Sequence, residues 1–128
     1  MKVNFLLIGL LATQMLAVDK AYSQTKPLNL SGPYLGQKLP DLKPEVFAPN
    51  IVSTPGWEVS GVFSPDLKEF YFIRGEQIKD KFQQEFVVIE NIDNQWHERI
   101  ISGRIGQPFI SLDGNTMHLG KRYKQRTS

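Results

Sequence analysis

Two serine–aspartate pairs are the residues whose types and spacing most suggest chemistry. Ser64 lies two residues before Asp66, and Ser111 lies two residues before Asp113. A serine close to an acid is a feature of nucleophilic sites, and two aspartates can share acid–base work or hold a calcium ion. However, neither serine lies in a Gly-x-Ser-x-Gly elbow or has an adjacent base. The sequence therefore does not support nucleophilic catalysis.

The two histidines, His97 and His118, are the other candidates for chemistry. They fall in separate predicted strands, so a shared metal ion would need further carboxylates from elsewhere. The sequence contains no His-Glu-x-x-His motif, no glycine-rich phosphate loop and no cysteine. We predict no catalytic, metal-binding or cofactor-binding residue, and expect no cofactor.

The serine–aspartate pairs belong to a longer repeat. Residues 61–72, GVFSPDLKEFYF, align without a gap with residues 108–119, PFISLDGNTMHL. Each copy has a short apolar strand, a Ser-x-Asp turn and a second strand. A repeat of about 40 to 50 residues with this content is typical of β-propeller blades. We therefore interpret both aspartates as turn-capping residues rather than as a catalytic or calcium-binding pair.

The turn chemistry supports this interpretation. Proline at the second position of a β-turn already has the required φ, and the aspartate that follows can accept nearby backbone N–H groups. The next position often needs a left-handed backbone. Gly114 suits it, whereas Leu67 pays about 1 kcal/mol there. The predicted structural turn residues are Ser64, Pro65, Asp66, Ser111, Asp113 and Gly114.

The first segment has the layout of a secretory signal peptide. A lysine near the start is followed by an apolar stretch over 5–18 and by the small residues Ala21 and Ser23. We expect cleavage between Ser23 and Gln24, which releases the protein to the periplasm or the medium. The stretch is short of the ~20 residues that span a bilayer, so a retained anchor is the weaker alternative. We expect no stable membrane anchor after cleavage.

The composition limits the partners. The chain has 15 basic and 13 acidic side chains, and this near balance argues against a nucleic acid or an anionic membrane as partner. A basic tail over 121–126 is either a phosphate-binding patch or, as we favour, a solvated strand end. Without cysteine, an exported protein has no disulfide, so its stability must come from packing.

Proline divides the mature chain into two parts. Residues 24–56 hold six of the eight prolines: Pro27, Pro33, Pro40, Pro44, Pro49 and Pro55. Because proline removes a backbone donor and fixes φ, we predict an extended leader that is neither sheet nor helix. Within it, residues 50–54 are expected to form a short strand that closes the ring of a propeller.

From residue 57 onward the pattern is that of strands. We predict an antiparallel four-stranded blade and the first two strands of a second blade, with a loop over 75–81 and a turn over 91–94. The expected strands are 59–63, 69–74, 86–89 and 95–102 in the first blade and 107–111 and 116–121 in the second. The predicted fold class is thus all-β, preceded by a signal helix and the proline-rich leader.

These residues resemble the TolB-type, WD-repeat-like propeller repeat of exported bacterial proteins. The matching pieces are 63–72 and 110–119, and Trp96 lies where the family often has a tryptophan. Leader residues 34–37 and 44–53 resemble the N-terminus of exported proteins with this repeat. The resemblance implies three regions: a signal peptide over 1–23, a leader over 24–56 and a partial propeller over 57–128.

A propeller typically needs four to eight blades, so we expect this sequence to be the N-terminal fragment of a longer protein. The expected function is a non-catalytic scaffold that binds a protein, peptide or glycan. One alternative is the propeller part of a secreted hydrolase or polysaccharide lyase whose active site lies beyond residue 128. Another is a purely structural envelope protein. Trp57, Tyr71 and Trp96 could form an aromatic platform for a ligand, although we favour core packing for them.

Overall fold

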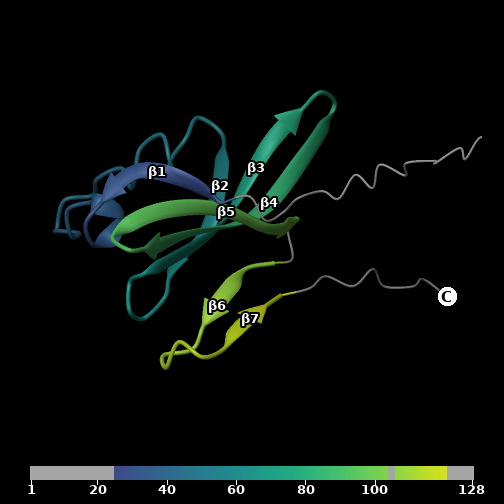
Figure 1. Ribbon diagram of the computed structural model, residues 1–128. Coiled ribbons are helices and arrows are strands. Elements are labelled where there is room, and N and C mark those ends of the chain that lie inside the picture. The colour runs from purple at the N-terminus through teal and green to yellow at the C-terminus, as the bar shows by residue number, and fades with distance from the viewer. Residues whose placement is uncertain (1–24, 104–105, 121–128) are drawn as a thin grey trace, which may run out of the picture.

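The protein is built from two antiparallel β-sheets, as the computed structural model shows (Figure 1). The structure describes residues 25–103 and 106–120. The expected signal helix, its cleavage site and the basic tail lie outside these residues. The first sheet has the strand order β1-β5-β4-β3-β2, and the second pairs β6 with β7. The strands are β1 (Lys26–Ser31), β2 (Trp57–Phe63), β3 (Glu69–Ile78), β4 (Lys81–Ile92), β5 (Gln95–Gly103), β6 (Pro108–Ile110) and β7 (Met117–Leu119).

Strands β2 to β5 form a meander in which each strand pairs with the next. The predicted all-β class with antiparallel strands is confirmed. In the central pair, Phe72 lies opposite Val87 and Phe70 lies opposite Ile89. These apolar side chains share one face of the sheet, because residues two apart along a strand point to the same side.

The predicted loop over 75–81 is wrong, because β3 and β4 continue through it as a long hairpin. β3 extends to Ile78 and β4 begins at Lys81, so two residues make the turn. In Figure 1 this hairpin projects beyond the rest of the sheet. The side chains at its tip are exposed, so the ribbon carries no apolar pattern that would mark it in the sequence. The turn predicted over 91–94 is shorter, with left-handed Asp93 and Asn94 between β4 and β5.

The leader was predicted to be irregular, and this is wrong for its first part. β1 pairs antiparallel with β5, with Lys26 opposite Glu98 and Pro27 opposite His97. The first sheet therefore has five strands instead of four. Pro27 is tolerated because β1 is an edge strand, where a missing backbone donor breaks no pairing with a further strand.

The predicted strand over 50–54 is also wrong. The segment is a tight turn in which the carbonyl oxygen of Ala48 accepts hydrogen bonds from the backbone N–H groups of Ile51 (3.1 Å) and Val52 (2.9 Å). Ala48 and Asn50 have positive φ values of 40° and 64°, which no strand allows. An isolated bridge between Pro49 and Ser53 is the only sheet-like pairing found among residues 48–54.

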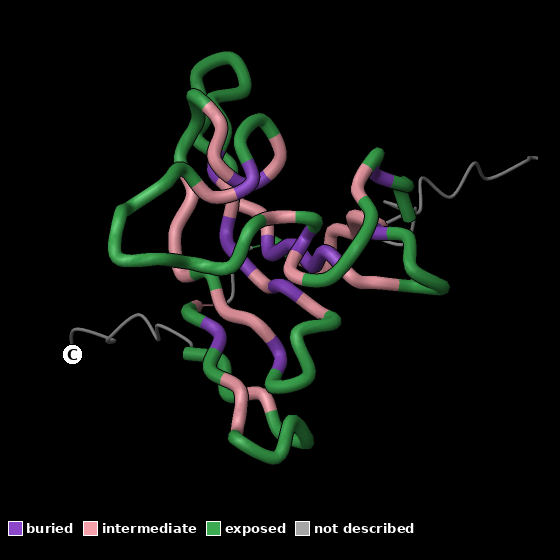
Figure 2. The backbone as a smooth tube through the Cα atoms, turned by 90° about the vertical axis from the view of Figure 1, so that its left-hand side faces the viewer, coloured by how far each residue is buried: buried purple, intermediate pink, exposed green. Residues whose placement is uncertain are grey.

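A short 3₁₀ turn, η1 (Tyr34–Gly36), and the turn near Val52 bring the leader back over one face of the first sheet. The leader and the sheet then share a single core (Figure 2). Its buried members are Leu28, Leu35, Ala48, Val52, Phe70, Phe72, Val87, Ile89 and Trp96. The proline-rich leader is thus an integral part of the folded unit.

The second sheet is a hairpin that extends away from the edge of the first sheet (Figure 1). Its strand β6 lies near β2, the first strand of the meander. Three apolar residues of the hairpin and its turn are exposed, namely Phe109, Leu112 and Leu119.

Candidate functional site

The first serine–aspartate pair forms a closed turn between β2 and β3. The Ser64 carbonyl oxygen accepts the N–H of Leu67 (2.9 Å), and the Ser64 N–H donates to the carbonyl oxygen of Glu69 (2.8 Å). The Ser64 Oγ accepts the N–H of Glu69 (2.9 Å). The same Oγ lies 2.6 Å from Oδ1 of Asp66, to which it donates. Asp66 Oδ1 also accepts the backbone N–H of Lys68 (3.1 Å). Both side chains are thereby engaged in holding the turn.

The second pair makes the same set of bonds between β6 and β7. The Ser111 carbonyl oxygen accepts the N–H of Gly114 (2.9 Å), and the Ser111 N–H donates to the carbonyl oxygen of Thr116 (2.9 Å). The Ser111 Oγ accepts the N–H of Thr116 (3.0 Å). Its hydroxyl donates to Asp113, whose Oδ1 accepts the N–H of Asn115 at 3.1 Å. The two turns therefore share these hydrogen bonds and have the same geometry.

The electrostatics of the turns agree with a structural role. The hydrogen bond from the Ser64 hydroxyl, followed by the backbone bond from Lys68, lowers the pKa of the Asp66 carboxyl. The corresponding bonds from Ser111 and Asn115 lower the pKa of Asp113. A general acid at neutral pH needs a raised pKa, so neither carboxyl is tuned for that task. The two turns belong to different sheets but lie close together, because a Cβ atom added to Gly114 would be 3.6 Å from Cδ of Pro65.

Exchanging residues at the left-handed position of each turn is expected to have opposite effects. Leu67 has φ 59° and Gly114 has φ 72°. Gly114→Leu should therefore lower the free energy of unfolding by about 1 kcal/mol or more, because a side chain is disfavoured at positive φ. Leu67→Gly should be neutral or slightly stabilising, since relief of strain offsets the larger entropy of unfolded glycine. Urea unfolding curves measure both, and a clear loss of stability in Leu67→Gly would contradict the shared geometry.

The histidines do not come together. His97 lies in β5, where Nδ1 is 3.1 Å from the carbonyl oxygen of Gln95. His118 lies in β7 of the other sheet, with its ring centroid 6.5 Å from that of Phe109. Within residues 25–103 and 106–120, no group of three His, Asp or Glu side chains is placed to hold a metal ion.

The three aromatic residues that could form a platform are divided between the two faces of the first sheet. Trp96 is fully buried in the core, and its Nε1 donates to the carbonyl oxygen of Gly32 at 2.8 Å. Tyr71 stacks on Phe86 on the other face of the sheet. Trp57 lies on the same face as Tyr71, because it is opposite Gly75 of β3, and it meets Phe82 edge-on with ring centroids 5.8 Å apart. These three residues thus form no common surface.

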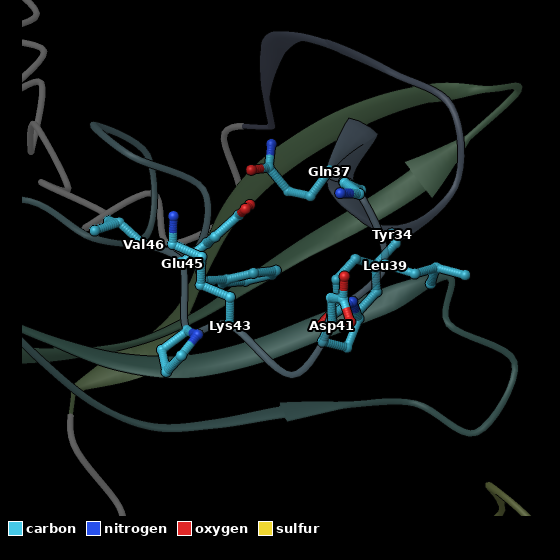
Figure 3. Close-up of a pocket in the computed structure, with 11 residues that line it drawn as sticks. Tyr34, Gln37, Leu39, Asp41, Lys43, Glu45 and Val46 are labelled. Atoms are coloured by element: carbon cyan, nitrogen blue, oxygen red, sulfur yellow. The ribbon is translucent and has the colours of Figure 1, made fainter.

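A hollow that the sequence did not indicate lies in the leader. It has a volume of about 270 Å³ and is lined by 11 residues, all from the stretch of chain between Tyr34 and Phe47 (Figure 3). Apolar surface comes from Tyr34, Leu39, Pro40, Pro44, Val46 and Phe47, and polar groups come from Gln37, Lys38, Asp41, Lys43 and Glu45. Local patterning does not reveal such a hollow, because it is formed by the folded path of the chain between residues 34 and 47.

The aromatic side of the hollow packs against rings of the first sheet. Tyr34 stacks on Phe63 with centroids 4.8 Å apart, and Phe47 contacts Tyr34 (5.4 Å), Phe63 (5.9 Å) and Phe70 (5.1 Å). These rings connect the hollow to the core of the first sheet. Buried Leu35 and Ala48 fasten the two ends of the lining segment to the same core. Of the features in the described residues, the hollow is the best candidate for a ligand site.

The class of the protein follows from these observations: it is an all-β protein whose two antiparallel sheets carry the same serine–aspartate turn. No protein-family model matches the chain, and searches of curated proteins and of solved structures found no match either. None of the described residues belongs to a helix with the length and hydropathy needed to cross a bilayer.

Proposed function

We propose that the protein is an exported β-propeller scaffold of the TolB-like, WD-repeat-like kind. In this proposal β2–β5 are the first blade, widened by β1, and the β6–β7 hairpin starts the next blade. The observation that carries the proposal is the repeated turn, in which Ser64 and Ser111 make equivalent hydrogen bonds. The position of β6 near β2 supports it, because blades of a propeller are arranged around a central channel.

The role of such a scaffold is to bind a protein, peptide or glycan rather than to catalyse a reaction. A ring typically needs four to eight blades, and the proposal assigns the missing blades to sequence beyond residue 128. The exposed Phe109 and Leu119 of the second hairpin are consistent with this, because later strands of the second blade would cover apolar positions there.

The length of the natural product tests the proposal. An antibody against residues 25–103 should isolate, from the organism that makes the protein, a product long enough for at least about four blades. Mass spectrometry gives its mass and its peptide map, and the map should include peptides with further Ser-x-Asp repeats. A natural product that ends at Ser128 would contradict the propeller.

Export gives a separate prediction. The mature protein is expected to begin at Gln24, because a short apolar stretch followed by Ala-x-Ser is a substrate for signal peptidase. Mass spectrometry of the N-terminal peptide from periplasmic and medium fractions measures this directly. Recovery of an intact Met1 in the membrane fraction would refute it, and Ser23→Pro, which spoils the cleavage position, is the matched control.

A further inference from the structure

The hollow of the leader is held in a strained backbone. Tyr34 and Leu35 have φ values of 54° and 55°, and Ala48 has φ 40° at the other end of the segment. Left-handed conformations cost side-chain-bearing residues on the order of 1–2 kcal/mol each. Such strain persists only where the surroundings impose it, and it is concentrated at functional sites. Here the core contacts of Leu35 and Ala48 impose it, so the loop is preorganised around the hollow.

The polar groups around the hollow retain their hydrogen-bonding capacity. Lys38, Lys43 and Glu45 make no ion pair or side-chain hydrogen bond with any other residue in the described parts of the chain. Gln37 donates to the carbonyl oxygen of Leu35 through one amide N–H at 3.3 Å, which leaves its amide oxygen free. Donors and acceptors are therefore both available to a ligand.

The charges around the hollow cancel. Two lysines, Lys38 and Lys43, are balanced by Asp41 and Glu45, so the lining has no net charge to attract an anion or a cation. The apolar surface of Tyr34, Phe47 and the prolines lies in the same lining. A matching ligand is uncharged, has hydroxyl groups that both donate and accept, and has an apolar face for aromatic contact.

The geometry points to a binding site for a neutral sugar unit in this hollow. Its volume of about 270 Å³ is near the lower end of the roughly 300–1,000 Å³ of small-molecule sites, so the ligand is small, such as a single sugar ring with its hydroxyl groups. Figure 3 shows the lining side chains arranged around this space. The inference deepens the proposed function by naming glycans as the ligand class, and it rests on that proposal only for a binding role. The sugar site does not require that the blades close into a propeller.

Titration of the isotope-labelled chain with maltose, cellobiose and N,N′-diacetylchitobiose tests the site by NMR. At least one of these neutral sugars should shift backbone amide signals within 34–47. The double variant Lys43→Ala/Glu45→Ala keeps the lining neutral and should weaken this binding about tenfold or more, because hydrogen bonds to charged groups are lost. The exposed ribbon variant Lys79→Ala, outside the hollow, should bind as the parent does.

The result that would overturn the inference is equally specific. Glucuronate or inorganic phosphate shifting the same signals more strongly than every neutral sugar would refute a neutral ligand. Absence of shifts within 34–47 for all three sugars would refute the site. Since both charged side chains are exposed, an unchanged amide spectrum of the double variant shows that it is folded. The mass of the natural product does not affect the NMR titration. The two experiments therefore distinguish a wrong sugar site from a wrong propeller proposal.

Discussion

Replacing Phe72 by alanine should lower the free energy of unfolding by about 3–5 kcal/mol. The Phe72 side chain is only 1% exposed and lies in the centre of the shared core. It is opposite Val87 across the β3–β4 pair and contacts the ring of Phe70, with centroids 5.8 Å apart. Alanine leaves a cavity that strands hydrogen-bonded on both sides cannot close, so the transfer and cavity costs add. Urea unfolding followed by tryptophan fluorescence measures the change.

Phe109→Ala is the matched control, because it removes the same ring from a side chain that is 69% exposed. Its effect should stay within about 0.5 kcal/mol. Lys68→Ala, in the exposed part of the first turn, should likewise change little. A loss below about 1 kcal/mol in Phe72→Ala would mean that this face of the sheet is not packed as described.

Replacing Trp96 by alanine should be as damaging and should also release the leader. Trp96 is 0% exposed and belongs to the core, so truncation costs about 3–5 kcal/mol. The variant also removes the indole N–H that donates to the carbonyl oxygen of Gly32, a contact between β5 and the leader. We therefore expect faster hydrogen exchange of leader amides as well as a lower denaturation midpoint.

Two comparisons separate these contributions. Trp96→Phe retains most of the apolar volume but not the donor, and should cost about 1–3 kcal/mol. Exchange should rise first at the amides of Ile51 and Val52, which depend on the turn at Ala48. The neighbouring exposed Gln95→Ala should leave both readouts unchanged. Equal exchange rates in the leader of parent and Trp96→Ala would show that the leader does not depend on this contact.

Much of the first sheet could be predicted from its residues. The apolar runs 70–73 and 86–89, rich in aromatic and β-branched residues, predict strands that are covered on both faces, and the structure buries Phe72 on one face and Ile73 on the other. The serine–aspartate turns were predictable for a related reason: their hydrogen bonds connect residues no more than five apart. The left-handed Leu67 could be inferred only by alignment with Gly114.

The errors concern contacts between distant parts of the chain. Pro27 indicated an irregular leader, yet a strand at the edge of a sheet accepts a proline. β1 becomes such an edge strand only by pairing with β5, which is distant in the sequence. The segment 50–54 has the apolar content of a strand, but the hydrogen bonds that the Ala48 carbonyl accepts from the next residues, together with the burial of Val52, favour a turn. The ribbon over 75–85 is stabilised by backbone pairing, which leaves no trace in side-chain hydropathy.

The sequence by itself determined the all-β class, the meander from residue 57 onward and the two equivalent turns, because these depend on local periodicity and on short-range hydrogen bonds. Only the tertiary structure decided that the leader adds β1 to the sheet, covers the core and encloses a hollow between Tyr34 and Phe47. The physical reason is that Leu35 and Ala48 are buried in a core shared with Phe70 and Phe72, more than 20 residues away, and this burial outweighs the local strain at their left-handed φ values.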